Sequence, residues 1–176
     1  GWPEWNRYNR TDDLDPLLEL IYRPDILKVL HSARQDLEVF YDLRKMPPAP
    51  IFDTQVAAAY LGYEDQVGYA ALVESITGVK LAKAHTRTDW AARPLRPEQI
   101  DYAEDDVRYL RDVYLQLRQR LDETGRTDWA MEEFAQLSDP ALYLNEPAQA
   151  WRRVKNGYQL APPAQPAKSA DAVKPV

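Results

Sequence analysis

The chain has 176 residues and no cysteine, and its 28 acidic against 22 basic side chains give a formal net charge of −6. One domain with a buried core is expected at this length, because 45% of the residues are apolar. The absence of cysteine excludes disulfide scaffolds, thiolate zinc sites, iron–sulfur clusters and thiol nucleophiles. With two histidines in the chain, a catalytic metal is expected on carboxylates, and the acidic balance argues against coating of nucleic acid through bulk charge.

Nothing in the sequence indicates insertion into a membrane or secretion. Its longest uninterrupted apolar run, residues 56–61, is far shorter than the roughly 18 residues of a membrane-spanning helix. No charged and then apolar leader opens the chain. We therefore expect a soluble, cytoplasmic protein without a membrane partner. Because residue 1 is glycine rather than methionine, we also expect a processed or clipped piece.

Hydrophobic periodicity and local start and stop signals predict mostly helices, with two short strands between them. A proline after Asp15 and a capping-box pattern at Ser32 and Gln35 mark two helix starts, and Gly78 and Gly125 mark two helix ends. In chain order, the sequence predicts a helix over residues 13–22, a strand over 26–31, a helix over 32–45, a strand over 51–53, helices over 55–61, 69–77, 97–121 and 128–137, and a last helical turn around Trp151.

This order of elements predicts the α/β class, mostly helical in the part that is present. Two strands are too few for an independent sheet, so we expect further strands to be missing from this chain. An unpaired sheet edge is then expected to favour self-association. Residues 1–12 show no periodicity, and the Pro, Ala, Lys and Ser composition of residues 161–176 predicts a disordered tail.

The helix predicted over residues 97–121 carries the first candidate site residues. Tyr102 and Asp106 are four positions apart and therefore share a face of this helix. Helical arithmetic places Asp106 on the flank of the apolar stripe, where a carboxylate is partly buried and suited to a metal ion. Asp105 is expected to point to water and Glu104 to lie well outside the stripe. The alternative is that all three acids are solvated helix charges.

A second candidate group lies where the first predicted strand ends and the next helix begins. Ligands collect at such places in open α/β sheets. Asp36 falls in the first turn of the helix, where the helix dipole alone could explain a negative side chain. His31 is a candidate for nucleic-acid binding, with a hydrogen-bonded histidine at a strand end as the alternative. Two aspartates on separate helices, Asp36 and Asp106, resemble half of a carboxylate-only magnesium site.

The polar, irregular segment before residue 97 holds candidates for binding a nucleic-acid strand. Arginines pair with phosphates, and an exposed aromatic ring stacks on a base. The candidates are Arg87, Trp90, Arg93 and Arg96. The alternative is that Trp90 belongs to the core and the arginines are solvated.

Three stretches of the sequence resemble, in the same order, motifs of the ribonuclease D family. The members of this family are DEDD-type 3′-5′ exonucleases, in the branch that has a tyrosine in the last motif. The second exonuclease motif of that family resembles VLHSARQDLEVF, the intermotif region resembles FDTQVAAAYLGYEDQVGYAALVESITGVKL, and the third motif resembles RTDWAARPLRPEQIDYAEDDVRYL. The resemblance covers residues 13–151 and implies a ribonuclease H-like exonuclease fold, incomplete at its N-terminal side.

The resemblance also implies a chemistry for the candidate residues. Asp36 corresponds to the aspartate of the second motif and Asp106 to that of the third, and Tyr102 corresponds to the tyrosine that positions the attacking water. Two divalent ions, Mg²⁺ or Mn²⁺, are implied to assist hydrolysis of the terminal phosphodiester bond and release of nucleoside monophosphates. The implied partners are RNA 3′ ends, in particular transfer RNA precursors.

Two parts of the family pattern are not found in this sequence. The first motif, Asp-x-Glu on the first strand, supplies two further metal-binding acids and should lie upstream of the region that starts here. Asp53 follows the second motif and matches a separate Asp-Thr element, so we assign it a structural role. Because Asp36 and Asp106 alone leave two ions short of ligands, we expect weak catalysis or none. The C-terminal helical nucleic-acid-binding (HRDC) domain is also expected to be absent, although residues 147–152 resemble the linker to it.

Two functional hypotheses follow. The first is a 3′-5′ exoribonuclease of ribonuclease D type, and the alternative is a noncatalytic RNA-binding or scaffolding remnant that lacks the acids of the first motif. A helical interaction module unrelated to nucleic acid would require the ordered motifs to be chance. The expected organisation is an irregular segment over residues 1–12, a partial exonuclease domain over 13–137, a linker over 138–160 and a disordered tail over 161–176.

Overall fold

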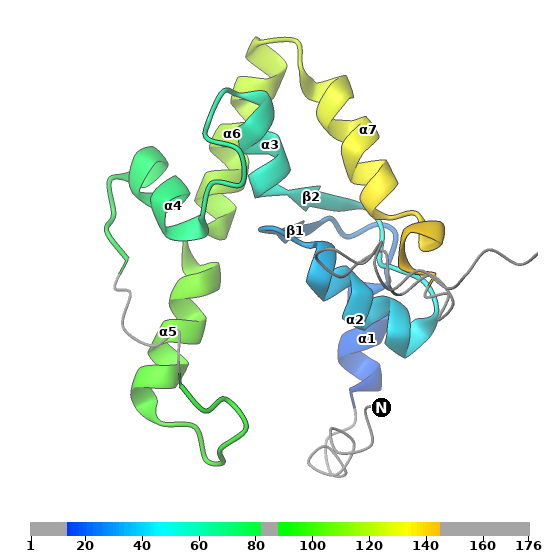
Figure 1. Ribbon diagram of the computed structural model, residues 1–176, viewed down its shortest axis with the longest axis vertical. Coiled ribbons are helices and arrows are strands. Elements are labelled where there is room, and N and C mark those ends of the chain that lie inside the picture. Colours follow the sequence, from blue (N-terminus) through cyan, green and yellow to red (C-terminus); the bar gives the residue numbers. More distant parts are fainter. Residues whose placement is uncertain (1–13, 82–87, 145–176) are drawn as a thin grey trace, which may run out of the picture. The chain divides into compact units, whose positions relative to one another are not determined.

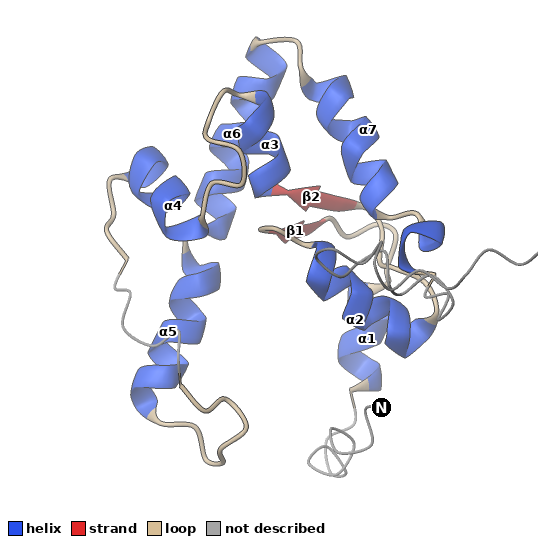
Figure 2. Cartoon of the chain, viewed as in Figure 1, coloured by secondary structure: helices blue, strands red, loops and turns tan. Residues whose placement is uncertain are grey.

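The computed structural model describes residues 14–81 and 88–144. Two short strands lie among helices, which confirms the mostly helical α/β class (Figures 1 and 2). The first twelve residues, the turn around Trp151, Arg87 and the tail over residues 161–176 lie outside the described residues. In chain order the elements are α1 (Asp15–Ile21), β1 (Lys28–Leu30), α2 (Arg34–Arg44), β2 (Ile51–Asp53), α3 (Thr54–Tyr60), α4 (Tyr69–Thr77), α5 (Pro97–Arg108), α6 (Leu110–Glu123), α7 (Thr127–Leu137) and a 3₁₀ turn (Pro140–Tyr143).

The strands β1 and β2 pair in parallel, with Val29 opposite Phe52 and Leu30 opposite Asp53. All three residues of β2 are buried, as its apolar sequence predicts, whereas those of β1 are half-buried. The strand predicted over residues 26–31 is shorter in the structure, because the Ile26 N–H donates to the Arg23 carbonyl in a turn. Since carboxyl ends of parallel strands meet at one edge, the starts of α2 and α3 lie side by side.

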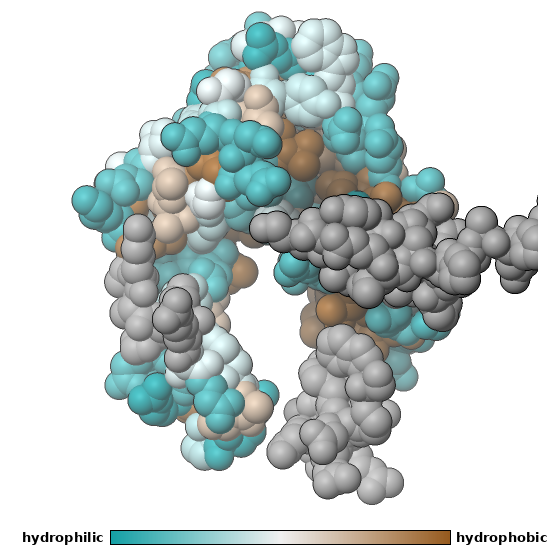
Figure 3. Space-filling model, in the orientation of Figure 1, coloured by the Kyte–Doolittle hydropathy of each residue, from teal (hydrophilic) through white to brown (hydrophobic). Residues whose placement is uncertain are grey.

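The core lies between the strands and helices α2, α3, α4, α6 and α7. The helix α6 contacts α3, α4, α7 and β1, while α7 contacts β2. Apolar side chains gather where the strands meet these helices, and polar ones cover much of α5 on the face seen in Figure 3. Fully buried side chains at the centre of this core include Leu37, Leu72, Val113, Leu117 and Leu121. No helix in the described part of the chain is long and apolar enough to cross a membrane.

Two sequence predictions about helix ends are wrong. Ser32 does not cap α2: the helix begins at Arg34, and Ser32 has a left-handed backbone with φ of 57°. The helix predicted over residues 97–121 is interrupted at Tyr109 and forms α5 and α6. The apolar residues of α5 do not continue the buried stripe of α6, since Ile100 is 46% exposed and Val107 62% exposed.

Candidate active site

A buried carboxylate joins the two strand ends at this edge of the sheet. Asp53 is 2% exposed and caps α3 by accepting hydrogen bonds from the N–H groups of Gln55 (2.8 Å) and Val56 (3.3 Å). It also accepts from the N–H groups of Ser32 (3.1 Å) and Ala33 (2.7 Å), which precede α2. One carboxylate thus accepts hydrogen bonds from backbone N–H groups at the start of α3 and in the turn before α2, where such groups lack partners within a helix. This supports the structural role assigned to Asp53.

The next side chain along β2 holds His31 in place. The Thr54 hydroxyl donates to the Leu30 carbonyl (3.0 Å) and lies 2.9 Å from His31 Nδ1. A hydroxyl has one proton, and this one goes to the carbonyl, so Nδ1 must carry its own proton and donate to Thr54. Burial lowers the pKa of His31, and the Asp53 carboxylate and the Val67 carbonyl oppose this shift. His31 is therefore held at the strand end through its Nδ1 atom.

Asp36 lies in the first turn of α2, three residues beyond the turn that Asp53 holds. Its side chain is exposed. Partial desolvation and the negative charge of Asp53 raise the pKa of the Asp36 carboxyl. Two like charges near each other attract a cation to the space beside them, which is the electrostatic character of a metal ligand.

The exposure of Asp106 and that of Asp105 are the reverse of the sequence predictions. Asp106 is exposed, whereas Asp105 is half-buried and forms an ion pair with Arg108 at 2.9 Å. The prediction placed Asp106 beside a buried apolar stripe, but on α5 that stripe faces solvent at Val107. Partial desolvation and the Asp105 charge raise the pKa of Asp106. In the described part of the chain, Asp106 has no ion pair.

Tyr69, at the start of α4, contacts His31 and lies within the electrostatic influence of Asp106. Its ring lies edge-on to the His31 imidazole, with centroids 5.5 Å apart. Burial, opposed by the Tyr109 backbone and reinforced by the charges of Asp106 and Asp105, raises the pKa of Tyr69 to about 12. Its hydroxyl is buried and meets hydrogen-bond geometry with no group in the described residues. Tyr69 therefore lies between the His31 side and the Asp106 side of the candidate site.

Trp90 packs against Tyr102, with ring centroids 5.9 Å apart and planes tilted by 47°. Trp90 keeps 38% of its surface exposed, so one part of the ring contacts Tyr102 and another faces solvent. Burial and the Asp106 charge raise the pKa of Tyr102. The structure thus brings Trp90, Tyr102 and Asp106 together on one side of α5.

The loop that carries Trp90 is fastened to α5 by a buried glutamine. Gln99 is 2% exposed; its amide donates to the Asp89 carbonyl (3.1 Å) and accepts from the Arg96 N–H (3.0 Å). The guanidinium of Arg93 donates to the Trp90 carbonyl (2.9 Å), and that of Arg96 donates to Thr88 (3.2 Å). Both arginines therefore stabilise the loop, and their outward N–H groups stay available to an anion.

Two acids among the described residues, Asp36 and Asp106, are the candidate metal ligands. Carboxylate oxygens are suitable ligands for Mg²⁺, and Asp36 and Asp106 both carry them. Nowhere in residues 14–81 or 88–144 do three His, Asp or Glu side chains gather closely enough to hold an ion. The two acids fit a divalent cation by their chemistry, but they do not complete its coordination by themselves.

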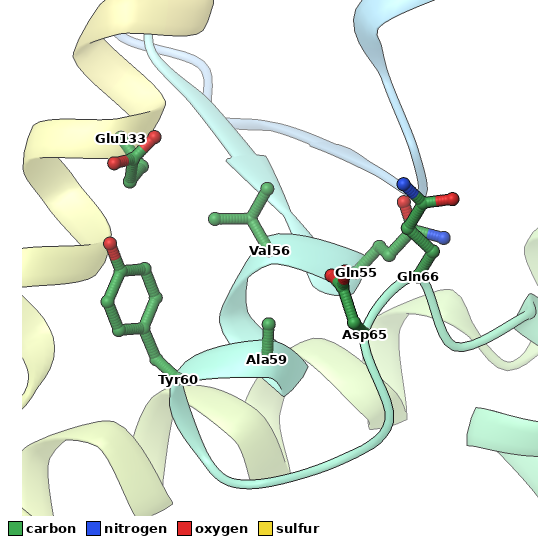
Figure 4. A pocket seen from close by; sticks show the side chains of 7 residues that line it. All are labelled: Gln55, Val56, Ala59, Tyr60, Asp65, Gln66 and Glu133. Atoms are coloured by element: carbon green, nitrogen blue, oxygen red, sulfur yellow. The ribbon is translucent and has the colours of Figure 1, made fainter.

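A cavity of about 300 Å³ lies elsewhere, between α3, the loop after it and α7 (Figure 4). It is lined by Gln55, Val56, Ala59, Tyr60, Asp65, Gln66 and Glu133. None of the candidate site residues lines it. Its two carboxylates, Asp65 and Glu133, disfavour phosphate, so this cavity is not a candidate for binding a phosphodiester.

Residues 6–122 of the chain match the sequence model of a protein family that is described as 3′-5′ exonuclease. The chain belongs to this family of 3′-5′ exonucleases. Within the family its relatives are ribonucleases D: that of Acidiphilium cryptum (strain JF-5) is 53% identical over 153 residues, which are 85% of this chain and 39% of the relative. The resemblance found in the sequence motifs is thereby confirmed. The chain spans about two fifths of the length of such relatives.

Solved structures agree with this assignment. Ribonuclease D of Escherichia coli, described as an exoribonuclease involved in structured RNA processing, superposes with a TM-score of 0.75 at 36% identity. The match covers 84% of this chain and 40% of that one. Brucella melitensis NrnC with bound Mg²⁺ matches with a TM-score of 0.65 at 30% identity, over 79% of this chain and 66% of that one. The ribonuclease H-like exonuclease fold is therefore confirmed.

Sequence reasoning missed two residues that the structure brings into the site. Tyr69 was considered only as the start of a helix, and no local signal indicates that its ring reaches His31 across the sheet edge. Gln99 was considered only as part of a helix. A signal was available for Gln99, because a polar residue three positions after a helix cap commonly bonds back to the cap.

Proposed function

We propose that this chain is the exonuclease domain of a 3′-5′ exoribonuclease of ribonuclease D type. The observation that carries the proposal is that the candidate residues share contacts and electrostatic influence. His31 contacts Tyr69 and Trp90 contacts Tyr102, while the charge of Asp53 acts on Asp36 and the charge of Asp106 acts on both Tyr69 and Tyr102. Residues that the family motifs mark as separate in sequence are linked by these interactions.

In this proposal Asp36 and Asp106 are ligands for divalent cations, Mg²⁺ or Mn²⁺, two ions in the complete site. When bound, such ions supply a water nucleophile and stabilise the leaving oxygen of the phosphodiester. The acids hold this positive charge from two different helices. Further ligands are needed, because the described residues contain no group of three.

Tyr102 orients the attacking water by donating its phenolic proton. Its pKa is raised by burial and by Asp106, so the phenol stays protonated at neutral pH and can act as a donor. Trp90 stacks on a base at the 3′ end, beside the bond to be cut, since its exposed ring borders Tyr102. Arg87, Arg93 and Arg96 contact phosphates of the same strand. His31 supports the site from the strand end.

The proposal is tested by digestion of a 5′-labelled RNA with a free 3′ end, first in Mn²⁺ and then in Mg²⁺. Slow shortening from the 3′ end is expected, because the described residues alone leave the ions short of ligands, and Asp106→Asn should abolish it. Asp105→Asn is the matched control: it removes a neighbouring carboxylate that already pairs with Arg108, and cleavage should persist. An RNA with a blocked 3′ end should resist the wild-type chain.

No shortening by a folded wild-type chain would contradict the proposal. Binding of the same RNA without cleavage would then favour a noncatalytic RNA-binding remnant. For the substrate we propose transfer RNA precursors with 3′ extensions. Faster trimming of such an RNA than of an unstructured oligonucleotide is the expected result, and equal rates would contradict it.

A further inference from the structure

Four consecutive residues before α2 are bonded to two residues, the last of β2 and the first of α3. Thr54 bonds to the Leu30 carbonyl and to His31, and Asp53 bonds to the N–H groups of the two residues that follow. We call the pair Asp53–Thr54 the clamp. Asp36 is the first candidate metal ligand beyond the clamped segment, in the first turn of α2.

The clamped segment has a backbone that needs support. Ser32 has φ of 57°, a left-handed conformation that costs a residue with a side chain of the order of 1 kcal/mol or more. Its N–H and that of Ala33 converge on the Asp53 carboxylate, at 3.1 Å and 2.7 Å. Bonds to a buried charged acceptor are stronger than neutral ones. Asp53 therefore fixes the turn that sets the direction of α2.

We propose that Asp53 is a positioning residue for the Asp36 carboxylate. It acts through the Ser32–Ala33 turn and does not itself touch substrate. Loss of the Asp53 charge leaves the Ala33 N–H facing an amide that offers it a donor, so the turn loosens and Asp36 moves with it. The catalytic part of this inference rests on the proposed function, whereas the part about the turn does not.

The first test observes the turn without reference to activity. The chain contains no cysteine, so Gln35→Cys carries one nitroxide label beside Asp36, on an exposed position. Asp53→Asn is expected to make this label more mobile, in samples shown to be folded by circular dichroism. Asp139→Asn is the matched control, because Asp139 likewise accepts a backbone N–H, from Ala141 at 2.9 Å, but lies outside the site. A label that is equally immobile in Asp53→Asn and in the parent would overturn the proposal.

The same comparison is made in a second parent protein, Ser32→Gly, so that the test still gives an answer if Asp53→Asn alone does not fold. Ser32→Gly accepts the left-handed backbone without strain, and it should offset part of the lost stability. The label is then compared between Ser32→Gly and the double variant Ser32→Gly/Asp53→Asn. Greater mobility in the double variant supports the proposal, and equal mobility overturns it.

The second test measures RNA cleavage. Partners that orient a metal ligand typically contribute 10–100-fold to activity, so Asp53→Asn should lower kcat by about tenfold or more with KM within about twofold. Asp139→Asn should keep both constants. An unchanged kcat, or an equal loss in Asp139→Asn, would overturn the positioning role. If the wild-type chain does not cleave RNA, the proposed function fails, and the label mobility still decides whether Asp53 holds the turn.

Discussion

The imidazole of His31 and the ring of Tyr69 meet edge to face at 5.5 Å, although His31 directly follows β1 and Tyr69 begins α4. Such aromatic pairs contribute about 0.5–1.5 kcal/mol beyond the area that they bury. This contact joins the strand end before α2 to the start of α4. The stability of the site therefore depends on residues that themselves carry none of the chemistry.

The Tyr69 hydroxyl contributes little to stability. It is buried, and although the Tyr109 backbone influences its pKa, no group in the described residues meets hydrogen-bond geometry with it, so its lost water is poorly compensated. Tyr69→Phe removes the hydroxyl and keeps the ring, and it should leave the free energy of unfolding unchanged or raise it by about 1 kcal/mol. Urea denaturation measures this. A loss of more than about 1 kcal/mol would mean that the hydroxyl makes a hydrogen bond.

Stability should fall as the solution becomes mildly acidic, because of His31. Burial holds the pKa of the folded His31 below its ordinary value of 6.5. Below about pH 7 the unfolded chain therefore binds more protons than the folded chain, and the free energy of unfolding decreases until the folded His31 also titrates. Urea denaturation between pH 5 and 8 measures this decrease. His31→Gln should flatten the curve in this range, and an unchanged slope in that variant would contradict the prediction.

Local sequence signals were sufficient for most elements but not for the details of the site. The apolar run of β2 and the glycine after α4 predicted both elements with the observed ends, because burial and a left-handed cap are decided locally. The predicted start of α2 was wrong because the turn before the helix is fixed by Asp53, which lies 20 residues away from Ala33 in sequence. The burial of Asp106 was wrong because periodicity shows which residues share a face and not whether another element covers it.

Removal of the Asp106 charge should stabilise the fold. Asp106 lies in the last turn of α5, where the helix dipole disfavours an anion, and Asp105 adds a like charge. Asp106→Asn should raise the free energy of unfolding at pH 7, by about 0.5 kcal/mol or less because solvent screens an exposed group. Asp105→Asn loses an ion pair with Arg108 and should show no such gain. Since protonation also removes the charge, the gain of Asp106→Asn should shrink toward pH 4.

Trp90 should contribute to RNA affinity, whereas Trp129, which is also exposed, should not. Stacking of a base on an aromatic ring is worth about 1–3 kcal/mol, so Trp90→Ala should weaken binding of a short single-stranded RNA by about tenfold or more. Trp129 on α7 is 57% exposed and has no contact with the candidate site, so Trp129→Ala should bind as the parent does. Fluorescence anisotropy of a labelled RNA measures both. Equal affinities of the two variants would contradict a stacking role.

The outer edge of β1 should make the chain self-associate. In the described residues β1 pairs with β2 alone, and α1 and α2 carry exposed apolar side chains, namely Leu17, Leu20, Val39 and Leu43. The Lys28 N–H donates to the Pro50 carbonyl (3.1 Å) on the β2 side, so the Val29 N–H, alternating along the strand, points to the open edge. Sedimentation velocity should show association that grows with concentration. Val29→Pro removes this donor and should weaken it, because proline is tolerated on an edge strand, and a wild-type monomer at all concentrations would contradict the prediction.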